Sequence, residues 1–107
     1  MISALIVRNR SLRSHFRYPT SIPAMLRFGF VSMPVVIRDV SARGVLIDIK
    51  QPPNCGSRVS ITANGLDVRG SIVWSSSTQC GIYFDEEVDP LEIVRKNLLA
   101  KPTSQTI

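Results

Sequence analysis

Residues 58–74 have the sequence RVSITANGLDVRGSIVW, in which two segments rich in β-branched residues flank the dipeptide Asn64-Gly65. An Asn-Gly pair between two such segments favours a two-residue hairpin turn of type I′. In the second segment apolar or small residues occupy every other position and end at Trp74, as expected for a strand with one buried face. We therefore predict a β-hairpin here, with the Trp74 side chain pointing into the core.

Similar short segments recur through the rest of the chain from residue 21 onward, at intervals of about ten residues. Turn-forming residues separate them, including a hairpin around Gly44 and a loop at residues 51–56 that contains two prolines and a glycine. In the last segment Ile82 and Phe84 share one face and Tyr83 lies on the other. This spacing predicts an antiparallel barrel or sandwich with strands at 23–30, 34–40, 45–49, 58–62, 68–74 and 80–84.

A helix is expected after the last strand. Asp89 is suited to be its N-cap, with a proline at the first helical position and Glu92 at the capping-box position. Leu91, Val94 and Leu98 recur at helical spacing, so they should pack on the barrel or on a partner. The sequence Lys-Pro-Thr-Ser at residues 101–104 is expected to end the helix.

The length and hydropathy of the chain limit its class. The 107 residues are enough for one domain and not for two. No uninterrupted apolar run approaches the roughly 20 residues that a membrane-spanning helix needs. Residues 1–7 are apolar but lack the basic start and the cleavage site of a signal peptide. We therefore expect a cytoplasmic protein without a membrane span.

Few residues are suited to catalysis or metal binding. The two cysteines, Cys55 and Cys80, lack the spacing of a zinc site or a disulfide scaffold, and we expect them to be buried or half-buried. The single histidine, His15, lies among arginines that would repel a metal ion. The chain offers neither a general acid and base pair nor an activated nucleophile. We predict no enzyme activity, no metal site and no cofactor.

Positive charge is concentrated at the N-terminal end. The net charge is +5, yet residues 1–38 hold six arginines and no acid, so the remaining residues sum to −1. Arginine presents a planar fork of donors that can bind a phosphate, or the O6 and N7 atoms of guanine, in a bidentate manner. The alternative is a solvated basic tail that binds polyanions without selectivity.

Two short motifs now stand together: RSHFR at residues 13–17, of the form RxxxR, and DVSARG at residues 39–44, of the form DxSxxG. With RxxxR just ahead of the first strand and DxSxxG at a strand end, they resemble the PilZ domain. The segments at 72–74 and 80–85 also resemble the end of that domain. The resemblance therefore covers most of residues 8–100.

The resemblance implies a fold and a domain organisation. The fold would be all-β with a C-terminal helix, in the form of a six-stranded antiparallel PilZ-type β-barrel. Residues 1–18 would be an arginine-rich arm that carries RxxxR, residues 19–100 the barrel with its helix, and residues 101–107 a flexible tail.

The resemblance also implies a function, as a receptor for the bacterial second messenger cyclic di-GMP. Arg13 and Arg17 would bind phosphate and guanine groups, and the facing wall would be formed by Asp39, Ser41 and Gly44. Auxiliary contacts would come from Arg8, Arg10 and Arg43. From the residues themselves, four arginines and a histidine at 8–18 with no acidic neighbour, we expect the arm to be mobile and to become ordered over the ligand, which would alter the contacts with a separate, unidentified effector protein.

The chemistry of these residues suits such a ligand. Arginine can pair with phosphates and with guanine O6 and N7, Asp39 can accept from guanine N–H groups, and the Ser41 hydroxyl can donate or accept. We expect Gly44, with positive φ, to let the backbone turn and approach the ligand closely. The competing interpretation of DxSxxG is an ordinary hairpin whose Asp and Ser side chains cap the turn.

Two other functions compete with the receptor. One is an interaction module of the same fold with weak or no nucleotide binding. The other is a general binder of single-stranded nucleic acid, which stacks bases on several aromatic residues along a sheet. Aromatic residues make up only 7% of the chain and cluster near its N-terminal end. We therefore expect no specific nucleic-acid partner.

Overall fold

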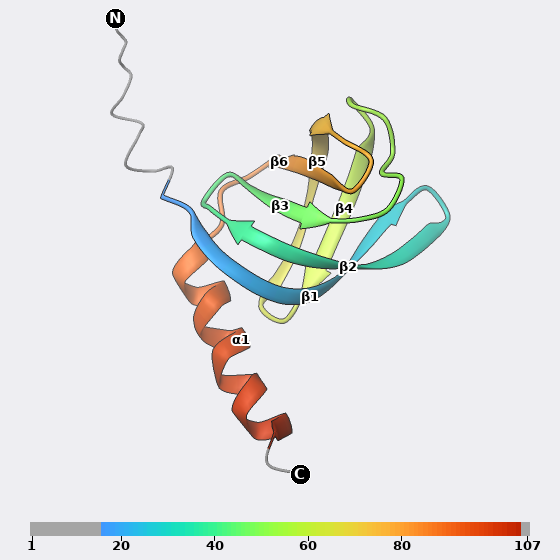
Figure 1. Ribbon diagram of the computed structural model, residues 1–107. Helices are drawn as coiled ribbons and strands as arrows, with labels where there is room; N and C mark the ends of the chain where they lie inside the picture. The colour runs from blue at the N-terminus through green and yellow to red at the C-terminus, as the bar shows by residue number, and fades with distance from the viewer. Residues whose placement is uncertain (1–15, 106–107) are drawn as a thin grey trace, which may run out of the picture.

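A computed structural model describes residues 16–105. Within these residues, six antiparallel strands form a closed barrel, which one helix follows (Figure 1). The strands are β1 (Tyr18–Phe28), β2 (Val31–Val40), β3 (Gly44–Asp48), β4 (Arg58–Ala63), β5 (Leu66–Ser75) and β6 (Gln79–Phe84), and the helix is α1 (Pro90–Gln105). The predicted six-stranded barrel with a C-terminal helix is confirmed.

The barrel closes in the order β1-β2-β3-β6-β5-β4, with β4 returning to β1. The closing contact is short, because only Met25–Arg27 of β1 pairs with Ser60–Thr62 of β4. On the other side, β3 pairs with β2 only from Val36 onward. The β1–β2 hairpin therefore projects beyond the rest of the barrel, on the side away from α1 (Figure 1).

The core consists of the inward side chains of all six strands together with Ile93 of α1. Most of these side chains are Ile and Val, which fit the pleated surface of a strand because their branched Cβ packs well there. Leu26, Ile37, Ile61 and Phe84 are among the fully buried ones. The alternation of apolar and polar residues along β2, β4 and β5 thus matches the burial of these strands over most of their length.

The first two strands are longer than the sequence indicated. β1 begins at Tyr18 and β2 at Val31, whereas we expected starts at residues 23 and 34. β1 thus includes Pro19, although proline cannot donate to a strand ladder. A register shift between Pro19 and Ile22 interrupts the regular pairing beside it.

The 63–66 hairpin forms as predicted, but its turn is of another type. Ala63 pairs with Leu66 across Asn64 and Gly65, and Gly65 has φ +83°. A type I′ turn needs positive φ at both central residues, and among residues 16–105 Gln51 is the only non-glycine residue with positive φ. Because Asn64 lacks it, the predicted type I′ turn is wrong.

Asp89 caps α1 as expected, since the Glu92 amide donates to Asp89 Oδ1 at 3.3 Å. The face that contacts the barrel is centred on the buried Ile93, with Val94 partly buried beside it. Leu91 and Leu98 are exposed, so of the three residues only Val94 packs on the barrel, and packing of the two leucines on a partner stays a prediction. Both lie outside the sector of the helix that Ile93 turns toward the barrel.

The helix also continues to Gln105, through the segment expected to end it. Pro102 removes a single backbone donor, and the helix extends past that one lost hydrogen bond. No helix in the described part of the chain is both long and apolar enough to cross a bilayer.

The two thiols lie in different environments. Cys80 is buried in β6, where burial raises its pKa to about 11. Cys55 is exposed, which contradicts the expectation that both would be buried or half-buried. It lies in a turn beside Gly56 in the loop between β3 and β4, where no strand covers it.

We predict that only Cys55 reacts rapidly with a thiol reagent at about pH 8, because the thiolate is the reactive form and Cys80 is held protonated and covered. Thiol titration of the native protein should give one fast equivalent, and titration in denaturant should give two. Two fast equivalents in the native protein would contradict the buried position of Cys80.

Candidate functional site

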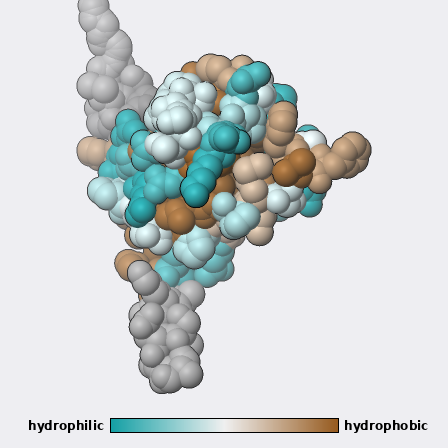
Figure 2. Space-filling model, turned by 45° about the vertical axis from the view of Figure 1, so that its right-hand side comes forward, coloured by the Kyte–Doolittle hydropathy of each residue, from teal (hydrophilic) through white to brown (hydrophobic). Residues whose placement is uncertain are grey.

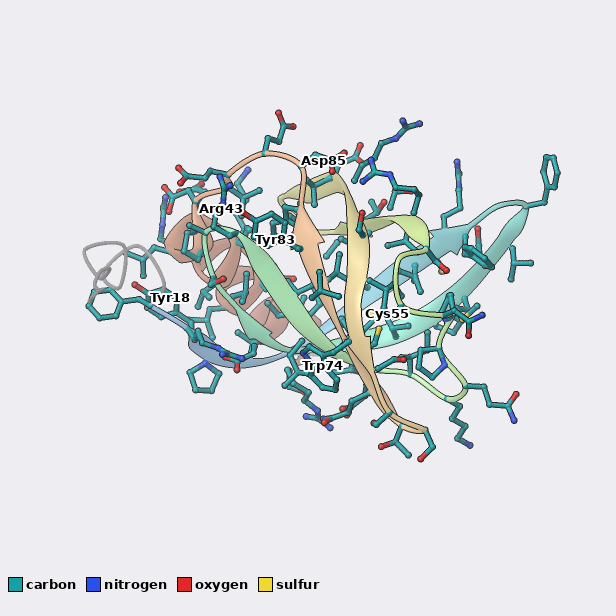
Figure 3. All side chains as sticks on the ribbon, turned by 90° about the horizontal axis from the view of Figure 1, so that it is seen from above. Tyr18, Arg43, Cys55, Trp74, Tyr83 and Asp85 are labelled. Atoms are coloured by element: carbon teal, nitrogen blue, oxygen red, sulfur yellow. The ribbon has the colours of Figure 1, made fainter. Side chains whose placement is uncertain are left out.

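The motif residues that the structure describes gather at a shallow pocket, which is formed where β2 turns into β3 and by the outer surfaces of β5 and β6. Its volume is about 200 Å³. Figure 3 shows Arg43 and Tyr83 beside each other near one end of these strands, with Trp74 further along β5. The lining residues are Arg17, Asp39, Val40, Ser41, Arg43, Gly44, Val45, Leu46, Val73, Trp74, Gly81, Ile82 and Tyr83.

The pairing of β1 with β2 brings the second arginine of RxxxR to the aspartate of DxSxxG. Pro19 pairs with Asp39, and Arg17 lies two residues before that position. Arg17 Nη2 is 3.3 Å from an Asp39 carboxylate oxygen, with the arginine largely exposed and the carboxylate mostly covered. The two motifs therefore meet at the rim of one pocket. Arg8, Arg10 and Arg13 lie outside the described residues.

Ser41 is bound within its own turn. Its amide donates to the Gly44 carbonyl at 2.9 Å, and its hydroxyl donates to the same oxygen at 3.2 Å. The hydroxyl also lies 3.4 Å from the Arg43 amide, from which it accepts. The serine thus caps the β2–β3 turn, as the competing interpretation of the motif supposed, while Asp39 contacts Arg17 instead.

Gly44 is required for a reason other than the expected one. Its φ is not in the positive region, so the expectation of positive φ is wrong. A Cβ at this position would lie 2.3 Å from the Ile82 carbonyl oxygen on β6. Because the obstacle is backbone, only glycine allows β3 and β6 to approach this closely at the wall of the pocket.

Arg43, the auxiliary residue of the motif, is held by three groups. Its Nη2 and Nε donate to the Tyr83 hydroxyl at 2.6 and 3.2 Å. Its guanidinium carbon lies 5.2 Å from the centre of the Tyr83 ring, and Nη1 lies 3.6 Å from Glu87. The hydrogen bond to Tyr83 raises the pKa of Arg43, so the guanidinium stays charged beside the pocket.

Trp74 lies outside the core, which corrects its predicted inward position. The pairing of β5 with β6 shifts in register between Ile72 and Trp74, and this irregularity breaks the alternation of inward and outward residues. Val73 and Trp74 are both exposed as a result, Trp74 by 45%. The indole lies against Gly81, where a Cβ would come within 2.4 Å of the indole nitrogen.

Trp74, Gly81 and Tyr83 are pocket residues that the sequence motifs do not include. The prediction that Tyr83 faces away from the core agrees with its exposed position, and this outward orientation could have marked Tyr83 as a pocket residue. The outward position of Trp74 could not be predicted, because a strand irregularity has no reliable sequence signature. Among residues 16–105, no group of three His, Cys, Asp or Glu residues is arranged to hold a metal ion.

Comparison with protein families finds a match to the PilZ domain over residues 11–100. Comparison with curated proteins finds no significant match. Both RxxxR and DxSxxG lie within the matched range.

Solved structures with a similar fold include three of known source. The inhibitor of motility MotI (DgrA) of Bacillus subtilis has a TM-score of 0.63 at 8% identity, covering 94% of this chain and 54% of that one. PlzA of Borreliella burgdorferi, solved in complex with c-di-GMP, has a TM-score of 0.54 at 20% identity, and the match covers 87% of this chain and 37% of that one. The PilZ domain of CeSA from a cellulose-synthesizing bacterium has a TM-score of 0.57 at 17% identity, and the match covers 84% of this chain and 99% of that one. The chain thus spans about half or less of the first two proteins.

The contact between Trp74 and Gly81 can be tested with the intrinsic fluorescence of the only tryptophan. We predict that Gly81→Ala displaces the indole into water and shifts its emission to longer wavelength. Gly44→Ala is the matched control: its Cβ meets backbone, so it should lower stability by about 1–3 kcal/mol, as overpacking does, with little change in emission. An unchanged emission spectrum in Gly81→Ala would contradict the position of Trp74.

Proposed function

The chain belongs to the PilZ domain family, and we propose that it is a bacterial, cytoplasmic receptor for cyclic di-GMP that passes its signal to a separate protein. The observation that carries this proposal is the contact of Arg17 with Asp39, since it joins the two ligand motifs at one pocket. PlzA, one of the proteins with a similar fold, was solved in complex with this ligand.

Arg17 and Asp39 would exchange their contact with each other for contacts with the ligand. Arg17 would bind a phosphate or the O6 and N7 atoms of a guanine, and Asp39 would accept from guanine N–H groups. The pair is partly exposed, and such pairs stabilise a protein by only about 0–1 kcal/mol. Separating the two side chains would therefore cost little compared with the hydrogen bonds that the ligand would form with them.

Trp74 and Tyr83 add aromatic surface to this site. The half-exposed indole lies against Gly81 and lines the pocket, so part of its ring is open to a ligand. Stacking of a base on an aromatic ring contributes about 1–3 kcal/mol. We assign Trp74 to guanine stacking. Arg43, held over Tyr83, would supply a positive charge beside it.

The pocket itself is small for this ligand. Its volume of about 200 Å³ is below the roughly 300–1,000 Å³ of typical small-molecule sites. The residues before β1 would therefore complete the site, with Arg13 as the other arginine of RxxxR. In this proposal the arm before β1, residues 8–17, becomes ordered on the ligand, and the surface around Phe16 and Tyr18 changes for a partner protein; Tyr18, which the sequence placed in the arm, is already paired with Val40 in β1.

A second function is favoured by one observation: the polar groups of the pocket already satisfy one another. Asp39 contacts Arg17, the Ser41 hydroxyl bonds to Gly44, and Arg43 bonds to Tyr83. A protein interaction module with weak or no nucleotide binding would have such a site. A direct measurement of cyclic di-GMP binding distinguishes the two functions, because only the receptor should bind the nucleotide tightly.

We predict that Arg13→Ala, Arg17→Ala and Asp39→Ala each weaken binding of cyclic di-GMP by about 1.5–3 kcal/mol, the contribution of hydrogen bonds to charged groups. The melting temperature should change little, because the Arg17–Asp39 pair is partly exposed. Isothermal titration calorimetry measures the first quantity and thermal denaturation the second.

The matched control is Arg38→Ala. Arg38 lies next to Asp39 in β2 and forms its own pair with Asp48 at 2.6 Å, outside the pocket. Its loss should leave the affinity unchanged. An equal loss of affinity in Arg38→Ala would indicate attraction by net charge alone, and unfolding of the Arg17 variant would make that residue structural.

The signalling step is tested by hydrogen exchange. We predict that the amides of residues 8–17 exchange more slowly in the presence of saturating cyclic di-GMP than in its absence, because phosphate contacts fix the arm. The amides of β4, away from the pocket, should be unchanged. Equal exchange of residues 8–17 in both states would refute the ordering mechanism and leave ligand binding itself untouched.

A further inference from the structure

The end of the β1–β2 hairpin forms a narrow, well-defined tip. Gly29 and Phe30 make a two-residue turn between the paired residues Phe28 and Val31. Gly29 has φ +61°. Glycine at the first central position with positive φ is what a type II′ turn requires, and this turn matches the twist of the two strands. Phe30 is therefore presented from a regular hairpin.

The tip is apolar and uncharged. Phe28 and Val31 are exposed, and Phe30 is fully exposed. No charged residue occurs from position 28 to position 37. The projecting end at the right of Figure 2 is correspondingly coloured as hydrophobic. A fully exposed aromatic ring at a turn contributes nothing to the described core, and a cluster of exposed apolar side chains is typical of an interaction site.

Positive charge lies directly behind this tip. Ser60 pairs with Arg27 on one side and Arg69 on the other, which aligns the two arginines across three strands. Neither forms an ion pair within residues 16–105. Arg58 lies closer still to the level of the turn and binds Asp85. These arginines line a pocket of about 250 Å³ together with Gly29, Val59 and Ser60.

Three acidic side chains lie beside these arginines, but none forms an ion pair with Arg27 or Arg69 within the described residues. Asp85 is engaged by Arg58, which lowers its pKa. Asp67 is paired with Thr62, in the same row as Met25, and therefore lies further from the turn than Arg27. Glu86 follows Asp85, and both line a second pocket together with Asp67, Arg27 and Arg69. Gly29 of the turn and Arg58 line only the first pocket, so the acids lie on the side of Arg27 and Arg69 that is further from the tip.

We propose that the β1–β2 hairpin inserts its tip into the interface of an anionic lipid bilayer, while Arg27 and Arg69 bind headgroup phosphates. An apolar tip above a basic surface is the arrangement that interfacial binding needs: burial at the boundary of headgroups and acyl chains, plus attraction to anionic lipid. Phe28, Phe30 and Val31 would enter this boundary. The proposal is independent of nucleotide binding.

The shape of the hairpin favours a bilayer over a protein partner. The tip is convex, so a protein would have to supply a fitting pocket, whereas a fluid interface needs none. The adjoining edge of β2, at residues 31–35, is not paired with β3, but Pro34 lacks an N–H there, so the edge is a poor template for an added strand. Pairing of β1 with β2 satisfies the backbone groups of the tip that face the partner strand, and the outward groups would stay at the hydrated level of the headgroups.

The test is flotation of the full chain with vesicles of equimolar phosphatidylcholine and phosphatidylglycerol, beside vesicles of phosphatidylcholine alone. Binding should be much stronger to the anionic vesicles. Phe30→Ser should weaken it about tenfold or more, as expected from removing a buried aromatic side chain. Arg27→Gln with Arg69→Gln should weaken it and reduce its dependence on salt.

Two variants on α1 are matched controls, because they remove an exposed leucine and an exposed arginine elsewhere. Leu91→Ser and Arg95→Gln should both float like the parent protein. Absence of binding to anionic vesicles would overturn the proposal in favour of a protein partner for the tip. If Phe30→Ser floats like the parent protein, the proposal is also overturned, because vesicle binding would then not depend on insertion of the tip.

A label next to the tip provides a second readout. In a Cys55→Ser background, Ser32→Cys carries an environment-sensitive fluorophore, because Cys80 is buried and unreactive. Its emission should shift to shorter wavelength on addition of anionic vesicles. An unshifted emission with bound protein would overturn the proposal, because another surface would then make the contact.

Discussion

The antiparallel pairing of β1 with β2 determines both surfaces of functional interest. At one end of the ladder, Tyr18 and Pro19 lie opposite Val40 and Asp39, which brings the preceding Arg17 to the DxSxxG turn. At the other end the same ladder runs past β3 and projects the apolar turn. A slip of one residue would move Leu26 and Ile37 out of the core and separate Arg17 from Asp39. The burial of these side chains therefore holds the site together.

The site is electrostatically balanced without a ligand. Arg17 is paired with Asp39, and Arg43 is shared between Tyr83 and Glu87. These contacts are partly exposed, so they keep opposite charges near one another without holding them in a deep, dry cavity. In the proposed complex, a ligand with two phosphates and two guanines would replace these contacts with charge-assisted contacts of its own. The same residues would thus stabilise the pocket and recognise the nucleotide.

The sequence pattern predicted the strands and the helix because they depend on features with a fixed period, whereas the choice of a barrel over a sandwich came from the resemblance to the PilZ domain. Alternation of apolar residues, the Asn64-Gly65 turn and the Asp89 cap each act locally, and the structure contains six strands and a helix where they indicate. It did not predict the irregularity beside Trp74, which arises from pairing with β6 and turns the ring outward onto Gly81. The role of Gly44 was likewise hidden, because its obstacle is the Ile82 carbonyl on a strand nearly forty residues away.

Selective recognition of cyclic di-GMP by the pocket that joins Arg17, Asp39 and Trp74 is the central claim. The most direct test is a calorimetric titration of the protein with cyclic di-GMP in the presence of excess GTP, repeated with cyclic di-AMP as the titrant. Adenine presents an N6 donor where guanine presents the O6 acceptor, so an arginine fork should reject it. We predict saturable binding of cyclic di-GMP that GTP does not abolish, and weak or no binding of cyclic di-AMP. Equal affinity for the two cyclic dinucleotides, or loss of binding to GTP competition, would contradict the claim.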